Sequence, residues 1–214
     1  MISKINNFQK ILFILTPIAF MLGPFLSNLH VSLFSFFFII LTLIEKKFER
    51  INIFFFIFLS FYFYIVLTSL LSDNPLFSLE ATLFYFRFIF FSFAVAYYIV
   101  KYDYIKKYFF YVSFFSLSFL FIDSLIQYYF KFNIFLMPLS ESLRVSSIFG
   151  QELIMGGYAT KLLPLALICL YSFIPNKASR NLLIFFLIAI TLILVLLSGE
   201  RSALFLFILS IIIY

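Results

Sequence analysis

Residues 182–197 read LLIFFLIAITLILVLL, an apolar run interrupted only by Thr191. A helix needs about 20 mainly apolar residues to cross a bilayer, and comparable runs recur along the whole chain. Of the 214 residues, 65% are hydrophobic and 11% are charged, and the mean hydropathy is +1.16. Soluble domains are about half apolar and about one quarter charged. The sequence therefore predicts an all-α, polytopic integral membrane protein.

Polar turns on both sides of this run divide the chain into spans. Pro175, Asn176 and Lys177 precede the run, and a Ser-Gly-Glu-Arg turn follows it. The same pattern predicts about eight transmembrane helices, at residues 11–26, 31–44, 51–71, 79–100, 105–128, 153–174, 182–197 and from 202 onward. The last run holds about 13 residues, too few to cross. We therefore expect an incomplete eighth helix, and residues 1–214 to form a single transmembrane domain, the N-terminal portion of a longer protein.

Positive charges are unevenly distributed between alternate turns. Of the 15 Lys and Arg residues, ten fall on one side, namely Lys4, Lys10, Lys46, Lys47, Arg50, Lys101, Lys106, Lys107, Lys177 and Arg180. The other side receives three, which are Lys131, Arg144 and Arg201. Because cytoplasmic turns of membrane proteins carry the excess of Lys and Arg, we expect the N-terminus in the cytoplasm. The polar segment 129–151 and the turn at 198–201 then face outward.

Charged side chains inside the spans need an explanation, because a cation at the centre of a helix costs about 2.5–3.5 kcal/mol on insertion scales. Arg87 and Lys161 each lie about 12 Å below the outer end of their predicted spans, and Asp123 lies about 7 Å below its own. Gln127 follows Asp123 by one turn on the same face. We expect these residues to line one polar, net basic cavity that opens outward and is rimmed by Arg144, Glu152, Glu200 and Arg201.

Structural roles explain the same residues without a ligand. Arg87 either snorkels toward the interface or pairs with Asp123. Lys161 either snorkels or pairs with Glu152. The glycine pair 156–157 serves close helix packing more often than phosphate binding. The arginines at the rim are either ligand-binding residues or ordinary loop charges.

The sequence carries no pattern for a cofactor or a metal. Cys169 is the single cysteine, so no intrachain disulfide is possible. We find no metal-ligand spacing, no phosphate loop and no Gly-x-Ser-x-Gly motif. The net charge of +6 is spread over turns between apolar spans, so it favours membrane orientation over nucleic-acid binding. Fixed cations in a low-dielectric setting suit an anion such as a diphosphate.

Several polar motifs follow one another along the chain between residues 87 and 203. They are Asp123 and Gln127, RVSSIFGQE at 144–152, Gly156-Gly157-Tyr158, Pro164 and SGERSA at 198–203, preceded by Arg87 in an earlier span. Together these motifs resemble the O-antigen ligase and O-antigen polymerase group of bacterial envelope glycosyltransferases. The resemblance covers roughly the last 130 residues. The chain departs from the pattern after Gln127, where a glycine-bearing turn is expected and Lys131 stands without a glycine.

The resemblance implies the N-terminal part of a GT-C-like, multi-pass glycosyltransferase of the bacterial inner membrane. Such enzymes move a glycan from an undecaprenyl-diphosphate carrier to an acceptor sugar at the periplasmic face, without a metal. The acceptor is another glycan or the lipid A-core, as in lipopolysaccharide or surface polysaccharide biosynthesis. The diphosphate would be held by Arg87, Lys161, Arg201 and Arg144, with supporting polar groups from Asp123, Gln127, Glu152 and Glu200.

In the ligases the general base belongs to a large periplasmic loop beyond the eighth span. We therefore expect the 214 residues to be inactive alone. Two other classes of function stay open. A flippase or other transporter of lipid-linked oligosaccharides would show internal repeats and charged helices near the midplane, and we detect no repeat. A non-catalytic membrane subunit of an envelope assembly is the third possibility.

Overall fold

The computed structural model describes residues 2–45, 53–140 and 144–213. Every regular element in these ranges is a helix, which confirms the all-α prediction. The predicted basic turn that contains Lys46, Lys47 and Arg50 lies outside the described residues. The α-helices are α1 (Ile2–Met21), α2 (Pro24–Glu45), α3 (Ile53–Leu70), α4 (Pro75–Thr82), α5 (Phe86–Lys101), α6 (Asp103–Phe130), α7 (Met155–Tyr171), α8 (Lys177–Ser198) and α9 (Arg201–Ile213).

Five helical segments in the described ranges are long and apolar enough to cross a membrane. They are Pro24–Glu45, Ile53–Leu70, Pro75–Lys101, Asp103–Phe130 and Lys177–Ser198. Two shorter apolar helices, α7 and α9, follow the loop after α6 and the turn after α8. These helices suggest a membrane protein. The total of eight spans and their orientation stay predictions.

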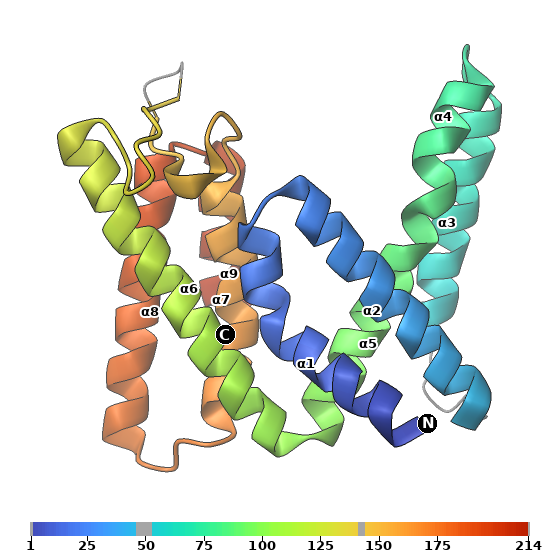
Figure 1. Cartoon of the computed structure of the whole chain (residues 1–214), viewed down its shortest axis with the longest axis horizontal. Coiled ribbons are helices and arrows are strands. Elements are labelled where there is room, and N and C mark those ends of the chain that lie inside the picture. Colours follow the sequence, from blue (N-terminus) through green and yellow to red (C-terminus); the bar gives the residue numbers. More distant parts are fainter. Residues whose placement is uncertain (1, 46–52, 141–143, 214) are drawn as a thin grey trace. The chain divides into compact units, whose positions relative to one another are not determined.

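The chain forms two compact units (Figure 1). Unit 1 comprises Met1–Phe13 and Asn28–Lys101, and unit 2 comprises Ile14–Ser27 and Tyr102–Tyr214. Each unit has its own buried residues and its own polar contacts.

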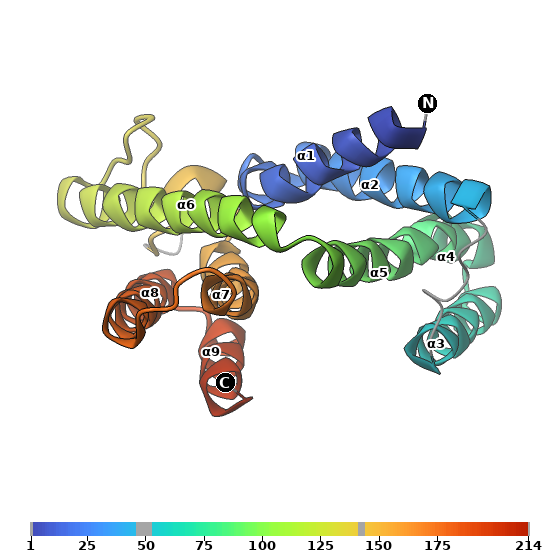
Figure 2. The same cartoon turned by 90° about the horizontal axis from the view of Figure 1, so that it is seen from below.

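Unit 2 is built around α7, which contacts α6, α8 and α9 (Figure 2). Leu163 and Leu170 of α7 are fully buried, as are Leu117 of α6 and Leu187 and Leu194 of α8. Side chains packed in this way fix the positions of the helices, because protein interiors are as dense as organic crystals. The ends of α6 and α8 and the starts of α7 and α9 consequently gather at one end of the unit (Figure 1).

Unit 1 packs α2 against α5 through aromatic side chains. The ring centroids of Phe34 and Tyr98 are 5.8 Å apart, and those of Phe13 and Tyr98 are 6.2 Å apart. All three side chains are fully buried. The Tyr98 hydroxyl lies 2.6 Å from Oε1 of the buried Gln9, whose Nε2 donates to the Phe34 carbonyl at 3.1 Å. These two hydrogen bonds satisfy polar groups of Gln9 and Tyr98 that would otherwise be costly to bury.

A short 3-10 turn, η2 (Leu83–Tyr85), joins α4 and α5 into one helical segment, Pro75–Lys101. The segment begins earlier than the predicted residue 79, because Pro75 presets a helical φ in the first turn. Within η2, the Leu83 carbonyl accepts a hydrogen bond from the Tyr62 hydroxyl at 2.9 Å. Arg87 lies 12 residues after Pro75 and 14 before Lys101, close to the middle of the segment.

Candidate functional site

Asp123 of α6 holds the segment that follows this helix. Its side chain is fully buried, and Oδ1 accepts a hydrogen bond from the backbone N–H of Ile134 at 2.8 Å. Oδ2 accepts a short hydrogen bond from the Ser147 hydroxyl. A carboxylate that accepts such bonds satisfies donors that burial would leave unpaired. Asp123 therefore faces the loop and is closed off from solvent.

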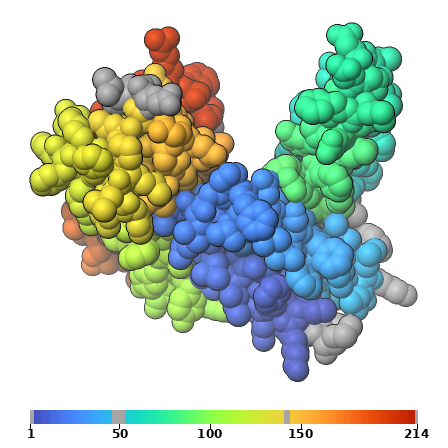
Figure 3. Space-filling model, turned by 45° about the horizontal axis from the view of Figure 1, so that its top comes forward, coloured from blue at the N-terminus to red at the C-terminus, as the bar shows by residue number. Residues whose placement is uncertain are grey.

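Gln127, one turn later on α6, binds the same loop with both ends of its amide. Oε1 accepts from the backbone N–H groups of Ser146 at 3.0 Å and Ser147 at 2.7 Å, and Nε2 donates to the Pro138 carbonyl at 3.1 Å. The side chain is fully buried. Asp123 and Gln127 thus act as one fastening for residues 131–140 and 144–149, which cover one end of unit 2 (Figure 3).

Asn133, which is not among the residues predicted from the sequence, completes this fastening. Its Nδ2 donates to the Ser147 carbonyl at 3.0 Å, and its Oδ1 accepts from the N–H groups of Phe135 at 3.0 Å and Met137 at 2.8 Å. An asparagine that bonds backbone N–H groups two and four residues on is typical of a tight turn. The sequence itself indicates a turn at Asn133. The bond to Ser147, 14 residues away, has no local sequence pattern that predicts it.

Glu200 binds the N-terminus of α7. Its Oε1 accepts from the N–H of Gly156 at 2.8 Å and its Oε2 from the N–H of Gly157 at 3.1 Å. These are the second and third residues of α7, where N–H groups lack helical partners and the helix dipole favours a negative charge. Glu200 thus fills the anion position at this helix end with a carboxylate of the chain itself.

The glycine pair lets this contact form. A Cβ on Gly156 would overlap the Ser198 hydroxyl and lie 3.0 Å from Cβ of Ala203. At Gly157 the nearest atom would be Oε2 of Glu200, at 3.3 Å. Gly156 therefore serves close helix packing, whereas Gly157 faces only the Glu200 carboxylate.

Two exposed arginines lie at the same end of unit 2. Arg144 lies against the turn between α8 and α9, with its Nε 3.3 Å from the position that a Cβ on Gly199 would take. Gly199 has a left-handed φ of +63° and ends α8, where a cation is favourable beside the last carbonyl groups. Arg201 instead opens α9, where the helix dipole disfavours a cation, and no acidic residue stands in that first turn.

Lys161 is also exposed, six residues into α7 and so about 9 Å from its start. It follows Gly157 by one turn, on the same face of the helix. Among the described residues Lys161 forms no ion pair with Glu152, which is exposed as well. Arg144, Lys161 and Arg201, three of the four predicted diphosphate ligands, therefore all belong to unit 2.

Arg87, the fourth, belongs to unit 1, where α2 holds it. Its Nη2 donates to Asn28 Oδ1 at 2.9 Å and its Nη1 to the Ser32 hydroxyl at 3.2 Å. Its carbonyl accepts from the Ser35 hydroxyl at 2.6 Å. In the structure, Arg87 thus binds α2 while Asp123 binds the loop after α6, and neither contact is the predicted pairing of the two.

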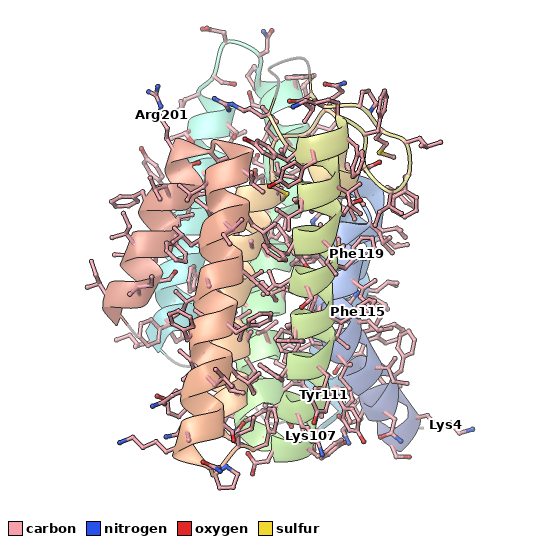
Figure 4. All side chains as sticks on the ribbon, turned by 90° about the vertical axis from the view of Figure 1, so that its left-hand side faces the viewer. Lys4, Lys107, Tyr111, Phe115, Phe119 and Arg201 are labelled. Atoms are coloured by element: carbon pink, nitrogen blue, oxygen red, sulfur yellow. The ribbon has the colours of Figure 1, made fainter. Side chains whose placement is uncertain are left out.

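The cations at the two ends of unit 2 differ in their side-chain contacts. Figure 4 shows Lys107, near the start of α6, and Arg201, at the start of α9, at opposite ends of the unit. Near Lys107, Lys106 pairs with Asp103 at 2.7 Å, and in α8 the Arg180 guanidinium lies 4.4 Å from the Tyr171 ring centroid. The end with Arg144 and Arg201 has no such ion pair among the residues that the structure describes.

No group of three or more His, Cys, Asp or Glu side chains within the described ranges is arranged to hold a metal ion. The candidate site consists of cations and hydrogen-bond donors. It offers positive charge at one end of unit 2 and a half-buried guanidinium in unit 1. Comparison with known proteins gave no match for this chain, whether among family models, curated proteins or solved structures.

Proposed function

We propose that the protein is an O-antigen ligase-like or polymerase-like glycosyltransferase of the bacterial inner membrane. It would bind an undecaprenyl-diphosphate-linked glycan at the periplasmic face and transfer the glycan to an acceptor sugar. The sequence motifs support this proposal, and so does the way in which Asp123 and Glu200 of unit 2 are engaged. The acceptor, either the lipid A-core or another glycan, decides between ligation and polymerisation.

The observation that carries the proposal is the engagement of Glu200. Both oxygens of its carboxylate accept backbone N–H groups of α7, at 2.8 and 3.1 Å. Asp123, the buried acid of the same unit, is likewise engaged by Ile134 and Ser147. Neither acid pairs with Arg144 or Arg201. Cations that pair with no acidic residue in the described ranges are suited to an anionic ligand, because charge-assisted bonds to phosphate are among the strongest in proteins.

The chemistry required of these cations is electrostatic. When the glycan leaves its carrier, negative charge develops on the diphosphate oxygen that held the sugar. Fixed positive groups placed there stabilise that charge more in the transition state than in the bound substrate. Arg144, Lys161 and Arg201 of unit 2 are the groups to which we assign this role, and to Arg87 of unit 1 we assign a phosphate contact within its own unit. We assign no general base to the described residues.

Binding of a labelled undecaprenyl-diphosphate glycan tests the proposal. The protein, expressed from its native gene and held in nanodiscs, would be compared with Arg87→Ala, Arg144→Ala, Lys161→Ala and Arg201→Ala at matched expression. We expect at least two folded variants to lose about tenfold or more in affinity, since each removes a charge-assisted contact. Lys107→Ala, at the other end of unit 2, is the matched control and should bind like wild type.

Unchanged binding in all four variants would contradict the proposal. A transfer assay then separates the enzyme from a transporter. Glycan delivered to lipid A-core or to another glycan supports a ligase or a polymerase. Cation-dependent binding accompanied by movement of the lipid across a vesicle membrane, without transfer, would instead identify a flippase.

A further inference from the structure

Arg87 in unit 1 is a cation with neutral partners. The Asn28 amide oxygen and the Ser32 hydroxyl, one turn apart on α2, accept from its two Nη atoms at 2.9 and 3.2 Å. The Ser32 hydroxyl itself donates to the Asn28 carbonyl at 2.8 Å, so its lone pairs are directed to the guanidinium. Two side chains of α2 thus fix the orientation of the guanidinium without changing its charge.

The guanidinium keeps unused bonding capacity. An arginine carries five N–H donors, and the two bonds to α2 use two of them. Nε is buried and has no hydrogen-bond partner. Within the described ranges no carboxylate pairs with Arg87. A charge inside an apolar helical segment is costly unless something compensates it, and such residues commonly mark a ligand or ion pathway.

The site is open to the surface of unit 1. Asn28 is exposed and Arg87 is half-buried, so one edge of the guanidinium is within reach of a ligand. On the inner side, the Ser35 hydroxyl binds the Arg87 carbonyl at 2.6 Å and anchors the backbone. The Arg87 backbone is consequently anchored by the buried Ser35, while its guanidinium lies at the surface of unit 1.

We propose that Asn28, Ser32 and Arg87 form a binding site for the phosphate group of a membrane lipid. Arg87 supplies the charge, and Asn28 and Ser32 are positioning residues that orient the guanidinium and leave that charge free. The inference rests on the proposed function in taking the carrier diphosphate as the ligand. An anionic phospholipid presents the same phosphate chemistry, so the experiment uses both.

Replacing Asn28 by aspartate distinguishes this site from a purely structural lock between α2 and α5. A carboxylate at the position of the amide oxygen would form an ion pair with Nη2. If the contact only joins two helices, the ion pair maintains or strengthens it. If the contact prepares a phosphate site, the new carboxylate neutralises the cation and repels the ligand.

Binding would be measured in nanodiscs for the protein expressed from its native gene, with undecaprenyl diphosphate and with phosphatidylglycerol as separate probes. We expect Asn28→Asp to weaken binding by about tenfold or more while its thermal unfolding midpoint equals or exceeds that of wild type. Arg87→Gln should weaken binding similarly. Ser27→Asp, which adds the same charge one residue earlier in α2, is the matched control and should bind normally.

Wild-type affinity in Asn28→Asp would overturn the inference, and the proposed function would still stand if wild type binds undecaprenyl diphosphate. Binding of phosphatidylglycerol alone, lost in Asn28→Asp, would support the site and count against the proposed function. Should Asn28→Asp fail to fold, the double variant Asn28→Ala/Ser32→Ala replaces it. Reduced affinity there supports the positioning role, and unchanged affinity overturns it.

Discussion

At the scale of single residues, adjacent glycines of α7 have different surroundings. A methyl group on Gly156 would meet Ser198, Ala203 and Glu200, whereas one on Gly157 would meet only the end of the Glu200 side chain. We predict that Gly156→Ala lowers stability by about 1–3 kcal/mol, as overpacking does. Gly157→Ala should be neutral or stabilising, because alanine is favoured over glycine in a helix by about 1 kcal/mol.

Thermal unfolding followed by circular dichroism would compare the two variants in the same detergent. Gly157→Ala is the control for Gly156→Ala, because the substitution is identical and the two positions are consecutive. Equal unfolding midpoints for both variants would show that Gly156 does not mediate the packing of α7 against the turn after α8.

At the scale of elements, α6 holds a loop that has little regular structure of its own. Gln127 contributes three of the bonds that fasten it, two from backbone N–H groups and one to a carbonyl. We predict that Gln127→Met, which keeps the volume but removes these bonds, loosens the loop by a few kcal/mol, since each buried partner left unpaired costs about 1–3 kcal/mol.

Limited proteolysis would report this loosening as faster cleavage within residues 131–149. Glu152→Met is the control, because the Glu152 side chain is exposed and binds none of these loop groups. We also expect Gln127→Met to weaken glycan binding, since Arg144 belongs to the segment that the fastening holds. A cleavage rate equal to that of wild type would contradict the assigned role of Gln127.

At the scale of the whole molecule, orientation in the membrane can be measured with thiol reagents. Cys169 is fully buried and is the single cysteine, so an introduced cysteine can be labelled selectively. Ser202 and Ser179 are exposed serines near the starts of α9 and α8, at opposite ends of unit 2. We predict that Ser202→Cys reacts with an impermeant reagent in intact spheroplasts and that Ser179→Cys reacts only after permeabilisation. The reverse pattern would place the N-terminus outside.

Much of the fold could be predicted from the sequence, because span positions follow from hydropathy. The predicted turn around Asn176 is present. The site was less predictable. The bond between Glu200 and Gly156 joins residues 44 positions apart, and that between Arg87 and Asn28 joins residues 59 apart. No local sequence pattern connects the two residues of either bond. Residue type and predicted depth in the membrane therefore point to Arg87 and Glu200 as polar residues of interest, but they do not identify the partners.

The contact between Glu200 and α7 also fixes the length of the turn between α8 and α9. An α-helix advances by about 100° per residue, since it has 3.6 residues per turn. One residue inserted between Gly199 and Arg201 would rotate Arg201 to a different side of α9 or draw Glu200 away from Gly156 and Gly157. Chains that share the contact between Glu200 and α7 should therefore keep both the number of residues in this turn and the identities of Gly199 and Glu200.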